Sequence, residues 1–329
     1  MKQIVFILVS FVFLSGQNNE SSQLINRIIE KIYQNNFAEA QLIADQLTQT
    51  DWGFGQLYQL TIMHVRNQDD ETIDQQRIDA FNTAISTYIA QMEHRADSLQ
   101  TAENLFLLGN AYFLKASEEN RLKNYYSAFR LSSSGREYLE KALELDPNWS
   151  DIKLSLGLYM YWKSVKAGDM FFISIFFADE REEGLAYIQD AIRNGRISEL
   201  SGKHQLISVL IQENRTDEAL KLANELIARY PHSRPILWAL GECQRKTGNW
   251  TDALTTYQEL LDYYLREENH YNSCQVLHKM ALCQSALGNK AEMSALMRQF
   301  RKIPISEANF ARLEKRLAEM NELSKSIGD

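Results

Sequence analysis

Three side chains that can bind metal ions, His270, Cys274 and His278, recur at every fourth position of one segment. On a helix this spacing places all three on the same face. Two adjacent members could share an ion, but three residues spread over two turns cannot all reach one, and no acidic residue completes the set. The spacing therefore indicates scattered helix-surface side chains, and we expect no metal site.

The remaining candidates for chemistry form no catalytic arrangement. The sequence contains no glycine-rich phosphate loop, no nucleophile elbow and no zinc-protease helix. Adjacent carboxylates such as Glu118-Glu119 and Glu182-Glu183 stand among Lys and Arg residues, as is typical of solvated helix faces. The other histidines, His64, His94, His204 and His232, share no common spacing. We expect a protein that is not an enzyme and requires no cofactor.

The most apolar internal stretch of the chain, Met170 to Phe177, allows two interpretations. Exposed, it would contact a membrane or a partner through Phe171, Phe172, Ile175 and Phe176. Buried, it would form a short helix folded against the rest of the chain. Burial is favoured, because no cluster of Lys or Arg flanks the segment to hold it at an acidic lipid surface.

Small residues recur at a fixed spacing along the chain, and this spacing predicts the helices that position the residues named above. Ala219 and Ala253 lie 34 residues apart, and each begins the second helix of a predicted helical hairpin after a short turn. A period in this range predicts a solenoid, in which each hairpin buries its apolar stripe against its neighbours. Small residues at the repeated positions mark close approach of two helices, because a larger side chain would push the backbones apart.

The residues around these anchors resemble the tetratricopeptide repeat (TPR), whose pattern combines Leu-Gly, a Tyr-like position, a small residue, an aromatic residue and a proline. The resemblance covers residues 101–297, whereas residues 22–100 are predicted to form degenerate helical hairpins. It implies an all-α fold, a right-handed α-α superhelical solenoid. The matching residues are Leu105, Leu108, Gly109, Tyr112, Gly135, Leu139, Ala142 and Pro147 in one copy, Leu156, Gly157, Met160, Gly184, Ile188 and Ala191 in the next, and Leu237, Leu240, Gly241, Gly248, Ala253 and Tyr257 in the cleanest one.

Two copies are longer than the family period. Gly109 and Gly157 lie 48 residues apart, and Gly135 and Gly184 lie 49 apart. The excess equals about two extra turns on each helix of a hairpin, so we expect lengthened helices within residues 101–194. This layout resembles a group of exported bacterial TPR proteins with no defined biochemical role.

The resemblance also implies a binding surface, because first helices line the concave face in this family. A groove that mixes aromatic residues with a few charges suits an extended or helical peptide. For Tyr161 the alternative of burial in the core stays open. Mapped one residue at a time, the partner-binding groove would be lined by Phe106, Asn110, Leu158, Tyr161, His204, Ser208, Trp238, Glu242, Arg245 and His278.

The two ends of the chain carry their own signals. Lys2, an apolar core from Ile4 to Leu14 and the small pair Ser15-Gly16 predict a secretory signal peptide over residues 1–16. Gln17 stands where a lipoprotein would have its Cys, so we expect a periplasmic or secreted protein without a lipid anchor. The alternative is an apolar first helix that stays attached.

At the C-terminal end, residues 306–326 are predicted to form a capping helix. A stacked array must end in a helix with one polar face, because its last apolar stripe has no further hairpin to cover it. The apolar residues Phe310, Leu313, Leu317 and Met320 recur there at helical spacing.

Together these features predict a non-enzymatic scaffold of the bacterial cell envelope that binds a protein or peptide on the concave face of a TPR solenoid. The alternative is a peripheral membrane-associated accessory protein that contacts lipid or a membrane partner through residues 170–177. The formal charge of −8 at pH 7 argues against nucleic acid as a partner, because binding its phosphates requires a basic surface.

Overall fold

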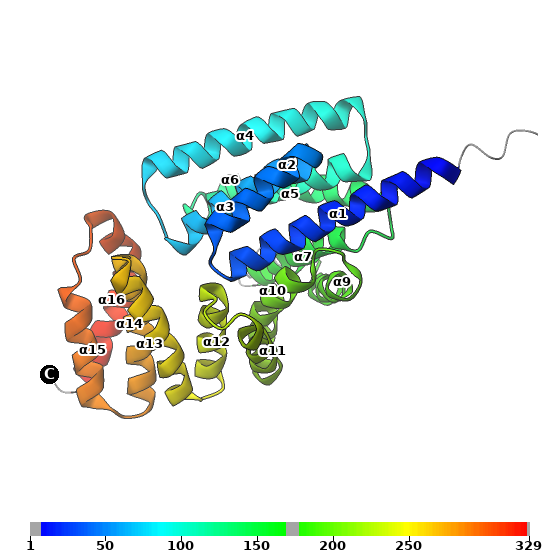
Figure 1. Ribbon diagram of the computed structural model, residues 1–329. Coiled ribbons are helices and arrows are strands. Elements are labelled where there is room, and N and C mark those ends of the chain that lie inside the picture. The colour runs from blue at the N-terminus through cyan, green and yellow to red at the C-terminus, as the bar shows by residue number, and fades with distance from the viewer. Residues whose placement is uncertain (1–7, 169–177, 328–329) are drawn as a thin grey trace, which may run out of the picture. The chain divides into compact units, whose positions relative to one another are not determined.

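The computed structural model describes residues 8–168 and 178–327 (Figure 1). These residues form fifteen helices and no strand, which confirms the predicted all-α class. The helices are α1 (Leu8–Tyr33), α2 (Phe37–Thr50), α3 (Trp52–Asp69), α4 (Gln75–Ser98), α5 (Ala102–Arg121), α6 (Tyr125–Leu145), α7 (Asp151–Gly168), α9 (Arg181–Asn194), α10 (Glu199–Gln212), α11 (Thr216–Arg229), α12 (Arg234–Lys246), α13 (Trp250–Arg266), α14 (His270–Ala286), α15 (Lys290–Lys302) and α16 (Glu307–Ile327).

The chain forms two compact units. Unit 1 comprises Met1–Gln68 and Ile73–Lys203, and unit 2 comprises Asp69–Thr72 and His204–Asp329. Unit 2 is therefore discontinuous in sequence, because the last residue of α3 and the three residues that follow it belong to the same unit as the C-terminal helices.

In unit 1, paired glycines set the distance between the helices of two hairpins. A Cβ built on Gly157 of α7 would lie 2.6 Å from the backbone oxygen of Gly184 in α9, and a Cβ on Gly184 would lie 2.7 Å from the oxygen of Gly157. Gly109 of α5 and Gly135 of α6 oppose each other in the same way, with 2.9 Å in both directions. The close approach expected at the small residues of the repeat is thus present.

The first of these hairpins is also long. α5 has 20 residues and α6 has 21, whereas α11 and α12 of unit 2 have 14 and 13. A difference of about seven residues adds roughly 10 Å to a helix. The extra residues of this copy therefore extend both of its helices. In the next copy α7 has 18 residues, but α9 has 14 and is no longer than α11, so the expected lengthening does not extend to α9.

Six of the described turns between consecutive helices share one backbone geometry. One turn residue adopts a positive φ, and the N–H of the next residue bonds to the carbonyl five residues earlier, as when Asn124 N donates to Glu119 O at 2.8 Å. This is the Schellman arrangement that satisfies carbonyls at a helix C-terminus. The positive-φ residues of these turns are Asn35, Lys123, Asn214, Gly248, Glu268 and Gly288.

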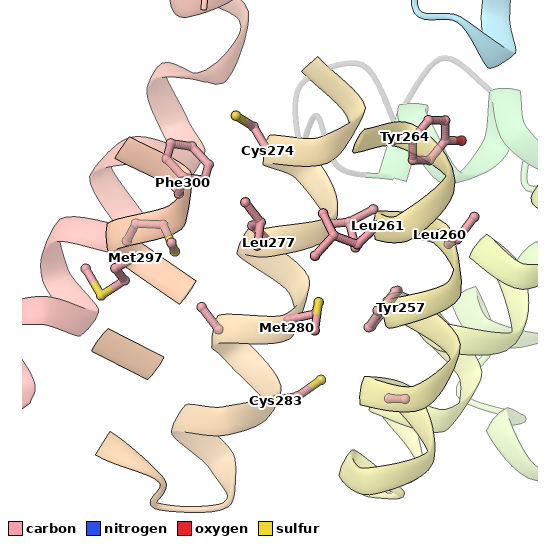
Figure 2. Packing of buried hydrophobic residues seen from close by; sticks show 14 of the residues in the cluster. Tyr257, Leu260, Leu261, Tyr264, Cys274, Leu277, Met280, Cys283, Met297 and Phe300 are labelled. Atoms are coloured by element: carbon pink, nitrogen blue, oxygen red, sulfur yellow. The ribbon is translucent and has the colours of Figure 1, made fainter. Parts of the chain in front are cut away.

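The core of unit 2 lies between α13, α14, α15 and α16. Figure 2 shows Tyr257 and Tyr264 of α13 on one side of α14 and Met297 and Phe300 of α15 on the other. The small residue of the repeat is Gly241 in this unit, and it faces a side chain instead of a backbone. A Cβ built on Gly241 would lie 2.6 Å from the ring of Tyr257. An aromatic side chain therefore occupies the space that helix backbones occupy in unit 1.

Helix α16 packs on α14 and α15 and completes this core. Leu313 and Met320 are buried within it, with 0% and 3% of their surface exposed. Phe310, expected on the same apolar stripe, is instead 54% exposed, because the packed part of the helix begins further along. Leu313 and Met320, in the middle of α16, therefore make its apolar contact with the core.

The glycine contact in α7 can be tested by adding one methyl group. Gly157→Ala should lower the free energy of unfolding by roughly 1–3 kcal/mol, because its Cβ meets backbone atoms that cannot rotate away. Gly168→Ala, in the same helix but with no atom of the described residues within 4 Å, is the matched control. Urea unfolding curves followed by circular dichroism give both values, and equal stability of the two variants would contradict a close contact.

A second substitution pair tests the packing of α16. Leu313→Ala should destabilise the protein by roughly 2–4 kcal/mol, since it empties a fully buried site. Phe310→Ala on the exposed side should change stability by about 0.5 kcal/mol or less. Melting temperatures that fall equally little in both variants would show that α16 is a dispensable tail.

Candidate functional site

Two helices of unit 2 present a row of polar side chains at helical spacing. Residues of α12 three or four positions apart share one side of that helix, and α14 contributes a matching row. We call this surface the α12–α14 face and define it by Arg234, Trp238, Glu242 and Arg245 of α12 with Asn272, Gln275 and Lys279 of α14.

One end of the α12–α14 face carries a partly exposed charge cluster. Arg245 donates to Glu242 through Nε (3.1 Å) and Nη2 (2.5 Å), and Lys279 Nζ lies 3.0 Å from the same carboxylate. The three side chains remain 21–27% exposed. Burial acts to raise the pKa of Glu242, but the hydrogen bonds and charges of Arg245 and Lys279 outweigh it, so the pKa is lowered. Two cations and one carboxylate leave this end with an excess positive charge.

Trp238 lies between that cluster and the other end of the face. Its indole Nε1 donates to the hydroxyl of Tyr264 at 3.0 Å, and its ring centroid lies 6.2 Å from that of Tyr257. The side chain is half-buried. It can therefore offer part of an aromatic surface while its polar atom is already satisfied.

The opposite end of the face holds the carboxylate of Asp69. Arg234 Nε lies 3.0 and 2.9 Å from the two carboxylate oxygens, and Nη2 contacts the same group. The guanidinium also lies 4.1 Å from the ring centroid of Tyr263. Asn272 Nδ2 donates to the backbone carbonyl of Asp69 at 2.8 Å. A buried arginine and an amide thus bind both the side chain and the main chain of one acidic residue.

Asp69 begins an acidic segment, Asp69–Glu71, whose other two residues are bound in a similar way. Asn269 Nδ2 donates to the carbonyl of Asp70 at 2.9 Å. Arg312 of α16 donates to the carbonyl of Glu71 at 3.0 Å and pairs with its carboxylate, with the guanidinium 3.9 Å from the ring centroid of Tyr271. Amide donors on carbonyls and cations on carboxylates are contacts with which a protein can bind a short acidic segment, here the last residue of α3 and the turn that follows it.

Three of the residues predicted to line the groove, Trp238, Glu242 and Arg245, lie together on this face. Two other predicted residues of unit 2 lie elsewhere. His204 Nε2 is 3.3 Å from the carbonyl of Pro235, and Ser208 is exposed. Burial lowers the pKa of His204, although the carbonyl acts against it.

His278 is not available to a partner. It is 4% exposed, and its Nε2 lies 2.8 Å from a carboxylate oxygen of Glu319 in α16. Burial lowers its pKa, with Glu319 acting to raise it and Lys279 and Arg316 acting to lower it. The capping helix therefore covers the position that the repeat pattern assigns to the groove.

The predicted residues of unit 1 lie mostly within its packing. Phe106 is buried with its ring centroid 4.6 Å from that of Trp149, and Tyr161 is fully buried. Leu158 is half-buried, and the Asn110 side chain accepts a hydrogen bond from Ser155 Oγ at 2.7 Å. For Tyr161 the structure thus shows the core position that the sequence left open. Phe171, Phe172, Ile175 and Phe176 lie outside the described residues.

The histidine and cysteine spacing on α14 does not produce a metal site. Cys274 is fully buried, and burial raises the pKa of its thiol to about 12. Within residues 8–168 and 178–327, no group of three His, Cys, Asp or Glu side chains is arranged to hold a metal ion. Cys243 and Cys283 are buried free thiols as well.

A cavity of about 360 Å³ lies in unit 1 and was not predicted. Its wall combines apolar side chains such as Phe54 and Trp149 with polar ones such as Glu103 and Asp151. Asp151 is already used structurally, because it accepts hydrogen bonds from the backbone N–H groups of Arg196 and Ile197, both at 3.0 Å. The mixed lining favours no single class of ligand.

Unit 1 also contains a hydrogen-bonded chain of Ser117, His64 and Glu118. Ser117 Oγ lies 3.0 Å from His64 Nε2, and His64 Nδ1 lies 3.1 Å from a Glu118 oxygen. Arg121 donates to both oxygens of the same carboxylate, at 2.9 and 2.6 Å. Ser117 lies inside α5, where its backbone N–H belongs to the helix and cannot stabilise an oxyanion. The arrangement therefore fits a structural ion cluster.

The Glu118 carboxylate is fully buried in this cluster, so the solvated helix face expected for Glu118 is wrong. Burial alone would raise its pKa, but hydrogen bonds from Arg121 and His64 outweigh that effect and lower the pKa to about 2. The folded protein therefore holds this group ionised, with both oxygens occupied.

Comparison with known proteins points to one repeat family. A family model of the tetratricopeptide repeat matches residues 210–273, which span the end of α10, all of α11, α12 and α13, and the start of α14. Among curated protein sequences, none matches this chain.

Several solved structures are similar to this chain at low sequence identity. PilW, a type IV pilus biogenesis factor, is 16% identical over 77% of this chain and 98% of its own, with a TM-score of 0.48. Human IFIT1, solved as a dimer with m7Gppp-AAAA, is 13% identical over 94% of this chain and 78% of its own, with a TM-score of 0.46. Yeast Tom70 is 10% identical over 95% and 83%, with a TM-score of 0.36. None of these similarities supplies a function for this chain.

The depressed pKa of Glu118 predicts a specific acid sensitivity. A group whose folded pKa lies below its unfolded value of about 4.3 stabilises the protein above that value and loses the contribution as the pH falls towards about 2. Glu118→Gln should therefore reduce the loss of unfolding free energy between pH 6 and pH 3 by on the order of 1 kcal/mol. Urea unfolding at the two pH values measures this loss.

Glu137→Gln, the same change at an exposed position of α6, is the control. An identical acid-induced loss in wild type, control and Glu118→Gln would show that this carboxyl is not held ionised by its neighbours.

Proposed function

We propose that this protein is a non-enzymatic scaffold that binds a protein or peptide through the α12–α14 face, because residues 210–273 match a family model of the tetratricopeptide repeat. The observation that carries the proposal is the binding of the acidic segment Asp69–Glu71 at one end of that face. Helices of this unit thus already hold a short piece of chain by its carbonyls and carboxylates.

The other end of the face has the chemistry to continue such a contact. Arg245 and Lys279 share the single carboxylate of Glu242, so a carboxylate from a partner would complete their pairing. Trp238 adds a half-buried aromatic side chain beside them. Partly exposed Trp and Arg residues are the side chains most often found to dominate binding energy at interfaces. A partner segment with an acidic and an apolar residue fits this surface.

The proposed location is the bacterial cell envelope, in the periplasm or outside the cell. Support comes from the leader, with Lys2 followed by the apolar core Ile4 to Leu14. Cell fractionation combined with mass spectrometry of the mature N-terminus tests it. A protein that retains residues 1–16 in the cytoplasmic fraction would contradict this location.

Loss of the two exposed cations tests the binding face. Arg245→Gln combined with Lys279→Gln should reduce recovery of specific partners in a periplasmic pull-down by about tenfold or more, because each paired charge at an interface contributes at least about 1.4 kcal/mol. Quantitative mass spectrometry compares the partners recovered with each variant, after circular dichroism has shown that both remain folded.

Arg301→Gln combined with Lys221→Gln removes the same two charges at exposed positions of α15 and α11 and is the matched control. Recovery of the same partners in the same amounts by wild type, control and the double variant of the face would refute the proposed binding surface.

A further inference from the structure

Three large aromatic side chains at the start of α6 are exposed to solvent. Tyr125 is 63% exposed, Tyr126 78% and Phe129 51%. They fall at helical spacing, with Phe129 four residues after Tyr125 and three after Tyr126, so they neighbour one another on the helix surface. A contiguous group of this kind on a soluble protein indicates a contact surface.

Basic residues border these aromatic side chains. Lys123 occupies the turn before α6 with a φ of 65°, and Arg130 follows Phe129; both are exposed. No acidic residue occurs between Leu122 and Arg136, although the whole chain has a formal charge of −8. The nearest acidic residues along the chain are Glu119 and Glu137. Residues 122–136 therefore carry only positive charges, on a protein that is negative overall.

The patch lies at one end of a hairpin, at the turn that joins α5 and α6 and on the first turns of α6. Among the described residues, no helix combines the length and apolar character needed to cross a bilayer. Contact with a membrane at this place would be peripheral.

We propose that this aromatic–basic patch, formed by Lys123, Tyr125, Tyr126, Phe129 and Arg130, binds the surface of a bilayer that contains anionic phospholipid. Tyr and Phe rings partition into the headgroup region, where their apolar bodies leave water and the Tyr hydroxyls stay hydrated. Lys and Arg beside them are attracted by the anionic headgroups. Charge complementarity therefore selects an anionic lipid surface, and the proposal is independent of partner binding by the α12–α14 face.

Vesicle sedimentation with the full chain tests the proposal. The protein should bind vesicles of phosphatidylglycerol mixed with phosphatidylcholine at least about tenfold more tightly than vesicles of phosphatidylcholine alone, and added salt should weaken that binding. Tyr126→Ser with Phe129→Ser, and separately Lys123→Gln with Arg130→Gln, should each weaken it by about tenfold. Phe310→Ser and the double variant Lys221→Gln with Arg301→Gln change matched exposed residues elsewhere and should bind as wild type does.

Several results would overturn the proposal. Wild-type protein that does not sediment with anionic vesicles refutes it directly. Binding that survives in both patch variants but is lost on Phe172→Ser with Phe176→Ser would assign lipid contact to residues 170–177 instead. Self-association of the wild type without lipid, abolished by the same patch substitutions in analytical ultracentrifugation, would identify the patch as an interface between copies of this chain.

Discussion

Backbone contact between paired glycines sets the helix spacing on which the packing of unit 1 depends. At Gly157 and Gly184 each missing Cβ would lie within 2.7 Å of the opposing carbonyl oxygen, so the two helices are as close as their main chains permit. That closeness lets side chains such as Tyr161 and Ile188 become fully buried. In unit 2 the ring of Tyr257 fills the equivalent space over Gly241. A small residue on the first helix of a hairpin thus permits contact with either a backbone or an aromatic ring, depending on which residue of the second helix lies opposite.

The parts of this structure that depend on local spacing could be predicted from the sequence. The helical class follows from the repeat, and Gly109, Gly135, Gly157 and Gly184 lie at the close contacts that their positions indicated. Trp238, Glu242 and Arg245 share a surface because helical periodicity places them on one side of α12. Positive φ at Lys123 and Glu268 was not foreseen, because such residues rarely adopt it. Five of the six turns nevertheless carry Asn after the positive-φ residue, which is a usable sequence signal.

Contacts between distant residues could not be derived in the same way. His64 meets Glu118 across 54 positions, and Asn272 meets the carbonyl of Asp69 across 203. No periodic pattern links such positions, so their pairing depends on how the helices pack. The prediction for His278 failed because the family pattern was extended to the last repeat. That pattern places His278 in the partner-binding groove, but in the structure α16 covers it and Glu319 pairs with it.

Unit 2 takes Asp69–Thr72 from a part of the chain that leaves the ribosome long before the rest of it. Asp69 precedes Arg234 by 165 residues, and Glu71 precedes Arg312 by 241. Because the entropy of closing a loop grows only with the logarithm of its length, this separation costs little stability. It does impose an order of events, since the acidic segment must wait for its cationic and amide partners until nearly the whole chain has been translated. A recombinant fragment that begins at His204 would lack residues 69–72, which belong to the same unit. A fragment that represents unit 2 must therefore carry this segment fused to it.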